Sequence, residues 1–233
     1  MTRGEWSKMQ QGRRILIIGA SGGIGAAMAD HARARGDAVT GLSRREDGLD
    51  VTDEDSIARH LGAFAPESFD AVLVTTGGLQ IGQHAPEKSL RALNAPALAA
   101  QFALNTIGPA LVFKHAAPLL PRRGRSVLAA LSARVGSIGD NRAGGWYGYR
   151  AAKAALNQII RATAIELARK HPQAICVALH PGTVTTSLTE DFRGRHPAVS
   201  PEQAASNLWS VIDALAPAQS GGFFDWAGKE VPW

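Results

Sequence analysis

The sequence predicts an α/β fold, a doubly wound parallel sheet flanked by helices, in a single domain spanning residues 1–233. Short apolar runs of strand length alternate with helical segments along the whole chain, which is the pattern of parallel strands joined by right-handed crossovers. A glycine-rich turn separates the first strand from the first helix, at the edge where such sheets bind ligands. The length suits one such domain and is short for two.

The first half of the chain is predicted to hold three strands and two helices. Residues 14–19 form a continuous apolar run, as expected of a strand buried on both faces. Gly36 is suited to close the first helix, and Thr52 with Asp55 three residues later indicates a capped helix start. The predicted elements are a strand over 14–19, a helix over 23–35, a strand over 38–43, a helix from 52 to about 64 and a strand over 70–75.

The second half begins with a long helix that Pro96 opens, with Asn94 near its cap and a bend expected at Gly108-Pro109. Residues 200–203 have the form of a capping box with proline at the first helical position. The predicted elements are a helix over 96–120, a strand over 126–131, a glycine-rich loop over 136–148, a helix over 149–171, a strand over 173–179, a helix over 200–215 and a strand over 222–224.

The composition favours a compact globular protein, since 45% of residues are hydrophobic and 19% are charged. The net charge is +5, but the basic residues are dispersed in pairs at 13–14, 44–45 and 122–123, without long runs or interleaved aromatic residues. We therefore expect no nucleic-acid partner. A basic surface that also attracts an anionic cofactor is the simpler account.

The single cysteine, Cys176, cannot form an internal disulfide and lies in an apolar run, where a buried small hydrophobic residue is expected. The first eight residues lack the apolar core of a signal peptide, and no uninterrupted apolar stretch is expected to approach a membrane span. Residues 1–12 are expected to be a flexible N-terminal extension. Together these observations predict a cytoplasmic protein without a membrane partner.

Glycine residues occupy the turn after the first strand. Gly19, Gly23 and Gly25 permit a tight turn and let phosphate oxygens approach backbone N–H groups at a helix N-terminus. The spacing differs by one residue from the common dinucleotide fingerprint, and no Gly-Lys-Ser/Thr follows as in a nucleoside-triphosphate site. A dinucleotide site is favoured over a purely structural turn. The candidate cofactor-binding residues here are Gly19, Ser21, Gly22, Gly23, Ile24 and Gly25.

The end of the second strand reads Ser43-Arg44-Arg45. An acidic residue at this place would accept hydrogen bonds from the adenosine ribose and favour NAD, whereas a guanidinium beside a hydroxyl can hold a 2′-phosphate. NADP(H) is therefore the predicted cofactor, with Ser43 and Arg44 as its ligands. We prefer Arg44 because Arg45 is expected to point away, and the alternative is a solvated surface arginine.

Tyr149 and Lys153 lie four residues apart in a predicted helix, on one face and one turn apart. Carbonyl reduction needs a proton donor to the developing alkoxide, and alcohol oxidation needs the same group as a base. A free phenol has a pKa near 10, about three units from neutral pH, and a neighbouring cation is expected to stabilise the phenolate. The alternative is an ordinary helix with both side chains solvated.

With these motifs the chain resembles the short-chain dehydrogenase/reductase family, whose fold is Rossmann-like, over essentially its whole length. The family's pattern corresponds here to the glycine turn, an aspartate after the family's third strand (Asp50), an asparagine in the central helix (Asn105), Tyr149/Lys153 and Pro181-Gly182. Residues 145–150 and 221–226 look like the small C-factor and sniffer-type carbonyl reductases.

The resemblance implies further roles. Asp50 would bond the adenine amino group, Asn105 would fix a water in a proton relay through Lys153, and Val184 and Thr186 would hold the nicotinamide carboxamide. The alternative for Asn105 is a polar residue at a helix bend. The cofactor-binding residues that the resemblance adds are Asp50, Val51, Thr76, Gly77, Gly78, Tyr149, Lys153, Pro181, Gly182, Val184 and Thr186.

Four departures from the family's pattern stand out. Ile18 replaces a threonine, and Thr75-Thr76-Gly77-Gly78 replaces Asn-Asn-Ala-Gly, so the support behind the adenine must be built differently. The segment between Arg45 and Asp50 is so short that the helix usual there is expected to be absent. Alanine stands in Ser132-Ala133-Arg134-Val135-Gly136 where the family has its catalytic serine. Ser132 is the candidate replacement, with Ser137 or a water as alternatives.

These observations predict an NADP(H)-dependent oxidoreductase that transfers hydride between the nicotinamide and a small carbonyl or alcohol substrate. Its candidate catalytic residues are Tyr149, Lys153, Asn105 and Ser132, and no metal ion is expected. The substrate is expected to enter beneath the loop over 186–199, where Phe192 and Trp146 suggest a partly apolar pocket. The resemblance implies a homodimer or homotetramer. The alternatives are a dinucleotide-binding signalling or sensor protein with little turnover, and an epimerase or dehydratase on the same fold.

Overall fold

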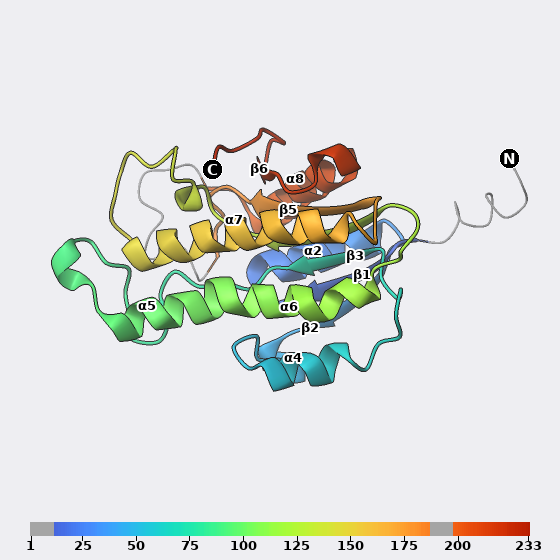
Figure 1. Ribbon diagram of the computed structural model, residues 1–233, viewed down its shortest axis with the longest axis horizontal. Helices are drawn as coiled ribbons and strands as arrows, with labels where there is room; N and C mark the ends of the chain where they lie inside the picture. Colours follow the sequence, from blue (N-terminus) through green and yellow to red (C-terminus); the bar gives the residue numbers. More distant parts are fainter. Residues whose placement is uncertain (1–11, 187–197) are drawn as a thin grey trace, which may run out of the picture.

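The computed structural model describes residues 12–186 and 198–233, which form a six-stranded parallel sheet with helices on both faces (Figure 1). The strand order is β2-β1-β3-β4-β5-β6, so the order reverses between β1 and β3. The doubly wound fold that the sequence predicts is therefore confirmed. The strands are β1 (Arg14–Ile18), β2 (Ala38–Leu42), β3 (Ala71–Val74), β4 (Ser126–Leu131), β5 (Ala174–His180) and β6 (Phe223–Asp225).

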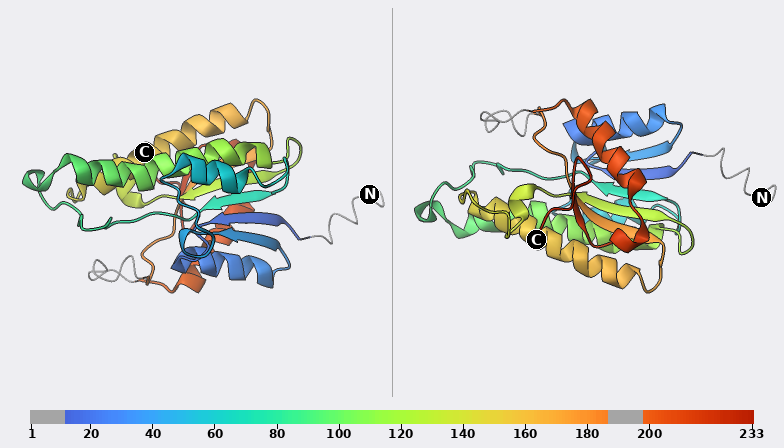
Figure 2. Two further views of the ribbon diagram at one scale, coloured as in Figure 1. Left: turned by 90° about the horizontal axis from the view of Figure 1, so that it is seen from below. Right: turned by 90° about the horizontal axis from the view of Figure 1, so that it is seen from above.

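Alternate residues of each central strand point to opposite faces of the sheet and form two cores. Leu16 and Ile18 of β1 belong to one core with residues of the helices over 54–61, 108–116 and 147–167, whereas Ile15 and Ile17 belong to the other with residues of the helices over 23–34 and 201–214. Figure 2 shows the two helix layers on either side of the sheet. Cys176 is buried in the first core, as predicted.

The helices that cover the sheet are α2 (Gly23–Ala34) and α8 (Pro201–Ala214) on one face, and α4 (Glu54–Leu61), α6 (Gly108–Ala116) and α7 (Tyr147–Leu167) on the other. The helix α5 (Ala95–Phe102) lies beside α7 and extends past the sheet. Short helical turns lie in the connections. These are α3 (Arg44–Asp47), η1 (Leu90–Ala92), η3 (Ala117–Leu119), η4 (Arg134–Gly136) and η6 (Pro217–Gln219).

Two local predictions on the β2–β3 connection are wrong. A single helical turn, α3, does exist after β2, because the Ser43 hydroxyl caps it by accepting from Glu46 N at 3.2 Å. The next helix is capped by Asp53, which accepts from Asp55 N, and not by Thr52. In addition, the resemblance places Asp50 directly after a third strand. In the structure Asp50 lies in the β2–β3 loop, after α3 and before β3.

The long central helix is continuous over Ala95–Leu119 but changes its winding in the middle. Residues Ala103–Ile107 form a π-helical turn, η2. Pro109 has no N–H to donate to the carbonyl of Asn105, and its ring clashes with that carbonyl, so the usual α-helical ladder cannot continue there. The helix irregularity predicted at Gly108-Pro109 is therefore present, but it lies one turn earlier, over Ala103–Ile107.

By length and composition an 18-residue window of this helical segment, with a mean hydropathy of 1.3, is also apolar enough to cross a membrane, which contradicts the expectation from the sequence. Of that window, 44% is buried inside the structure, and Val112 and Phe113 of the same segment pack in the core.

Several predicted features lie outside the described residues. These are most of the N-terminal extension and most of the loop over 186–199, including Phe192.

Candidate active site

A cavity of about 330 Å³ lies at the carboxyl ends of the strands, where the strand order reverses between β1 and β3. The glycine turn, the end of β2, the β2–β3 loop and the end of β3 surround it. The predicted residues that line it are Gly19, Ser21, Gly22, Ser43, Arg44, Asp50, Val51, Thr76 and Gly77. The unpredicted ones are Ile18, Arg45, Leu49, Thr75 and Leu104.

The glycine turn leaves no room for side chains and presents its backbone to this cavity. A Cβ on Gly25 would lie 2.2 Å from the Gly19 carbonyl oxygen, and Gly19 has φ +94°. Gly22 is the N-cap of α2 and provides no side-chain cap, so first-turn N–H groups are left for an anion. Ile24 packs on the core beneath. This arrangement fits the phosphates of a dinucleotide.

The two threonines after β3 have different roles. Thr75 Oγ1 donates a 2.9 Å hydrogen bond to the Ile18 carbonyl oxygen, which ties the ends of β3 and β1 together. Thr76 Oγ1 is buried and has no hydrogen-bond partner in the described part of the chain. Since buried hydroxyl groups are normally paired, Thr76 is suited to bond a ligand in the cavity that it lines.

Arg44 and Arg45 both line the cavity, so the expectation that Arg45 points away is wrong. Arg45 lies 3.2 Å from the Glu46 carboxylate and 3.5 Å from the Ser21 carbonyl oxygen, both nitrogen-to-oxygen distances. Among the described residues no ion pair of Arg44 is found. The Ser43 side chain is buried and used in capping α3, which leaves the guanidinium groups as the main charged groups at this end of the cavity.

Asp50 is held by Thr52, whose backbone N and Oγ1 donate to Asp50 Oδ1 at 2.8 and 2.7 Å. These two hydrogen bonds, with a smaller contribution from the charge of Arg44, lower the pKa of Asp50. The carboxylate therefore stays ionised at the edge of the cavity. Its second oxygen, Oδ2, is the atom available to accept from a ligand amino group.

Gly77 connects this cavity with the Tyr149/Lys153 pair. A Cβ on Gly77 would lie 3.0 Å from Asn105 Oδ1 and 3.4 Å from Lys153 Nζ, so both groups face the cavity-lining backbone. The Lys153 ammonium thus lies beside one end of this cavity, although neither Lys153 nor Tyr149 is among the residues that line it.

Asn105 is fully buried, and its side chain holds the segment after β3. Its Oδ1 accepts from Gly78 N at 3.1 Å, and its Nδ2 donates to Gly78 O and to Gln101 Oε1, each at 2.8 Å. The role implied for this side chain was to fix a water. In the structure its hydrogen bonds join the central helix to Gly78.

Tyr149 lies in the first turn of α7, which begins two residues earlier than predicted. The Lys153 ammonium lies 5.8 Å from the centre of the Tyr149 ring and donates a 2.8 Å hydrogen bond to the Leu131 carbonyl oxygen at the end of β4. The two side chains therefore converge as the spacing predicts.

The pKa values of the pair shift in opposite directions. Burial raises the pKa of Tyr149 to about 12 and lowers the pKa of Lys153 to about 8, because in each case the charged form is disfavoured away from water. The expectation that Lys153 keeps the phenol acidic is therefore wrong for the protein by itself. Burial is the cause of the raised pKa, and Tyr149 is protonated at neutral pH.

The hydroxyl of the candidate serine already donates a hydrogen bond within the protein. Ser132 is buried, and its Oγ donates a 2.7 Å hydrogen bond to Asn157 Oδ1, one helical turn beyond Lys153. Ser137, the alternative, is also buried, and its Oγ accepts from Asp140 N at 3.1 Å.

The segment after β5 returns toward the glycine turn. A Cβ on Gly23 would lie 2.9 Å from Thr186 Cγ2, so Thr186 lies against the start of α2. Val184 is buried and bridges to Val199, and Gly182, with φ +80°, lies against the Trp226 ring. Pro181 precedes this turn and is partly buried.

Sequence reasoning missed Glu87, a buried carboxylate that holds the start of α7. Its Oε2 accepts from Gly148 N at 3.1 Å and its carbonyl oxygen accepts from Trp146 N. Glu87 lies about 60 residues before α7 in the chain, so no local pattern could indicate the contact. In the part of the chain that the structure describes, no group of three or more potential metal ligands is found.

Residues 48–214 match a protein family described as enoyl-(acyl carrier protein) reductase. The chain is 31% identical over 234 residues to a 1-hydroxy-2-glutathionyl-2-methyl-3-butene dehydrogenase of Rhodococcus sp. (strain AD45), covering 94% of this chain and 99% of that relative. It is 36% identical over 137 residues to the C-signal of Myxococcus xanthus, covering 58% of this chain and 78% of that one.

Solved structures of the same architecture include a Burkholderia multivorans protein described as a short-chain dehydrogenase/reductase with bound NADP, with TM-score 0.78, 25% identity and coverage of 95% of this chain and 99% of that one. The NADPH-bound carbonyl reductase from chicken fatty liver has TM-score 0.80 and 22% identity, with coverage of 96% and 95%. The carbonyl reductase Sniffer of D. melanogaster has TM-score 0.75 and 19% identity, with coverage of 96% and 100%. Because the last two are less than 25% identical to this chain, they show similarity of fold only.

Proposed function

The chain belongs to the short-chain dehydrogenase/reductase family of oxidoreductases, and from this premise we propose that it is an NADPH-dependent reductase of small carbonyl compounds. One observation carries the proposal: the Lys153 ammonium, which lies over the Tyr149 ring, also lies beside Gly77 in the cavity that the glycine turn lines. This supports a proton donor close to a dinucleotide site.

The preference for NADPH rests on charge. Arg44 and Arg45 stand at the end of β2, where a 2′-phosphate can accept charge-assisted hydrogen bonds from a guanidinium. Asp50 lies beyond them, in the β2–β3 loop, and its Oδ2 is suited to an adenine amino group. The solved structures of similar fold that hold NADP or NADPH support the same choice.

When bound, NADPH supplies the hydride that goes to the carbonyl carbon of the substrate. Tyr149 donates its phenolic proton to the carbonyl oxygen as that oxygen becomes an alkoxide. Because burial raises the pKa of Tyr149 to about 12, the phenol holds this proton at neutral pH and is available as the general acid that carbonyl reduction needs. The Lys153 ammonium, held by the Leu131 carbonyl oxygen, stabilises the phenolate that remains.

The carbonyl oxygen receives its hydrogen bond from Tyr149 in this proposal. Ala133 occupies the family's serine position, and the Ser132 hydroxyl is already used toward Asn157. We propose that a water supplies any second hydrogen bond to the carbonyl.

The experiment is a direct assay of NADPH oxidation with a panel of aldehydes, ketones and pterins, alongside NADPH binding by calorimetry. Turnover of at least one carbonyl class, lost in Tyr149→Phe, supports the proposal. Tight NADPH binding without turnover on any of them would instead support the second candidate, a dinucleotide-binding signalling protein. The altered serine position and the similarity to the C-signal of Myxococcus xanthus favour that candidate.

We also propose a cytoplasmic homodimer or homotetramer. Exposed apolar side chains on the α5–α7 layer, such as Ile107 and Ile165, which are 50% and 54% exposed, are suited to packing between subunits. Sedimentation of the purified protein measures its oligomeric state directly.

A further inference from the structure

Tyr149 lies in the first turn of α7, and the residue at the N-cap of that helix provides no side-chain cap. This residue is Trp146, whose backbone has φ +50°, in the left-handed region that bulky residues adopt only when the surrounding structure holds them there. A helix start of this kind depends on other parts of the chain. Its position matters because it sets the position of the phenol that the proposed reaction uses.

Glu87 supports this turn from a loop that precedes Gly148 by 61 residues. The Glu87 carbonyl oxygen accepts a hydrogen bond from Trp146 N, and Glu87 Oε2 accepts from Gly148 N at 3.1 Å. The second bond satisfies an N–H group of the first turn that has no partner within the helix. The backbone is thereby held both at the N-cap and immediately before Tyr149.

The Glu87 side chain is closely packed at this place. It is 5% exposed, and a Cβ on Gly148 would lie 2.9 Å from Glu87 Oε1 and 3.2 Å from Gln101 Cγ. Gln101 in turn donates to the Leu79 carbonyl oxygen at 2.7 Å and accepts from Asn105 Nδ2 at 2.8 Å. The start of α7 is therefore in contact with Glu87 and with the hydrogen-bonded side chains of the central helix.

Arg150, the residue after Tyr149, holds the loop before α7 independently of Glu87. Its Nε donates to the Gly145 carbonyl oxygen at 2.9 Å, and its Nη1 donates to the Val135 carbonyl oxygen at 3.2 Å. These two bonds keep the loop joined to the helix when Glu87 is replaced. We therefore expect the loss of Glu87 to displace the first turn without unfolding α7.

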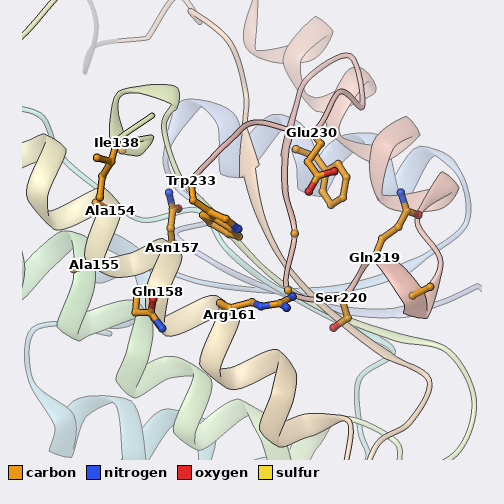
Figure 3. Close-up of a pocket in the computed structure, with 15 residues that line it drawn as sticks. Ile138, Ala154, Ala155, Asn157, Gln158, Arg161, Gln219, Ser220, Glu230 and Trp233 are labelled. Atoms are coloured by element: carbon orange, nitrogen blue, oxygen red, sulfur yellow. The ribbon is translucent and has the colours of Figure 1, made fainter. Parts of the chain in front are cut away.

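Further along, α7 is packed on one side and open on another. Leu156 and Ile160 are buried against the sheet. Ala154, Gln158 and Arg161 instead line a second cavity, of about 850 Å³, between α7 and the tail that follows β6 (Figure 3). A helix with an open side is fixed by fewer packed neighbours, which makes the contacts at its start more important for its position.

We propose that Glu87 is a positioning residue for Tyr149. It acts through the backbone of Gly148 and holds the phenol at the place from which the proton reaches the carbonyl oxygen. This inference rests on the proposed function. A misplacement of a reacting group by about 1 Å can lower turnover about 100-fold, so a residue that only fixes the turn has a large effect on the reaction.

The test compares two replacements of Glu87, with turnover measured well below the unfolding temperature of each variant. Glu87→Leu keeps much of the volume and removes the acceptor, and should lower kcat about 10- to 100-fold while the KM for the carbonyl compound and the Kd for NADPH stay within about twofold of wild type. Glu87→Gln keeps an oxygen that can accept from Gly148 N and should retain at least about a third of the wild-type kcat.

Asn94→Leu is the matched control. It removes the cap of α5, where Asn94 Oδ1 accepts from Ala97 N at 2.9 Å, and leaves the cap of α7 in place. It should lower the unfolding temperature but change kcat by no more than about twofold. If Glu87→Leu does not fold, Glu87→Ala takes its place with the same expectations, since it introduces no new bulk.

A second measurement does not depend on turnover. Tyr147 and Tyr149 are the two tyrosines of the chain, so in a Tyr147→Phe background a 3-fluorotyrosine label reports on Tyr149 alone. We expect a single sharp ¹⁹F resonance in this background protein and at nearly the same position after Glu87→Gln. Glu87→Leu should shift or broaden that resonance.

The inference is wrong if Glu87→Leu turns over the carbonyl compound as wild type does, or if it leaves the ¹⁹F resonance unchanged. Equal losses of kcat in Glu87→Leu and Asn94→Leu would also contradict it, because general destabilisation would then explain both. If the wild-type protein oxidises NADPH with no carbonyl compound, the proposed function fails, and the ¹⁹F comparison still decides whether Glu87 positions Tyr149.

Discussion

Lys153 lies over the ring of Tyr149, 5.8 Å from its centre, while its ammonium donates to the Leu131 carbonyl oxygen and not to the phenol. Burial therefore governs both pKa values, raising that of Tyr149 to about 12 and lowering that of Lys153 to about 8. The phenol of the protein by itself therefore keeps its proton. During turnover its pKa is lowered by positive charges that come to lie near it. The oxidised nicotinamide ring is one such charge.

Replacement of the two arginines separately tests the cofactor preference. Arg44→Ala should raise the Kd for NADPH about 10- to 100-fold, because a charge-assisted contact to the 2′-phosphate is lost, and should change the Kd for NADH little. Arg45→Ala is the matched control and should have a smaller effect, because Arg45 already pairs with Glu46. Equal losses for NADH and NADPH in Arg44→Ala would count against the phosphate contact.

Asn105→Ala tests whether the hydrogen bonds of the Asn105 side chain stabilise the folded protein. Its removal leaves the Gly78 N–H and C=O groups without their buried partner, so the free energy of unfolding should fall by about 2–4 kcal/mol in urea denaturation. Asn207→Ala, on α8 where Asn207 makes an exposed side-chain pair, should stay within about 0.5 kcal/mol of wild type. A fully stable Asn105→Ala protein without turnover would point to a relay role alone.

His180 makes stability depend on pH. Burial lowers the pKa of His180 from 6.5 to about 4, with a smaller contribution from the charge of Arg134. The unfolded chain therefore takes up a proton that the folded chain excludes, so stability is fully present above pH 6.5 and is lost as the pH falls toward 4.

The contribution of His180 is up to about 3 kcal/mol. Urea denaturation between pH 7.5 and pH 4.5 measures it. His180→Asn should show a shallower loss of stability over this range than wild type. Parallel pH profiles for the two proteins would contradict the assignment to His180.

Short-range patterns predicted much of this molecule, and contacts between distant segments explain the rest. The apolar runs, the glycine turn and the Tyr149/Lys153 spacing each act within one element, so the sheet, the first helix and the converging pair could be predicted. The capping of α7 by Glu87 and the hydrogen bond of Ser132 to Asn157 join segments far apart in the chain, and no local pattern encodes them. The direction of the Tyr149 pKa shift depends on packing around the phenol, which spacing alone does not describe.

The most direct test of the proposed mechanism is the turnover of Tyr149→Phe with a carbonyl substrate and NADPH, with Tyr147→Phe as the matched control, since these are the two tyrosines of the chain. We predict that Tyr149→Phe lowers turnover about 10²- to 10⁴-fold, as expected for loss of a general acid, while its Kd for NADPH stays close to that of wild type. Tyr147→Phe should retain turnover. Undiminished turnover in Tyr149→Phe would contradict the proposed role of this phenol as the proton donor.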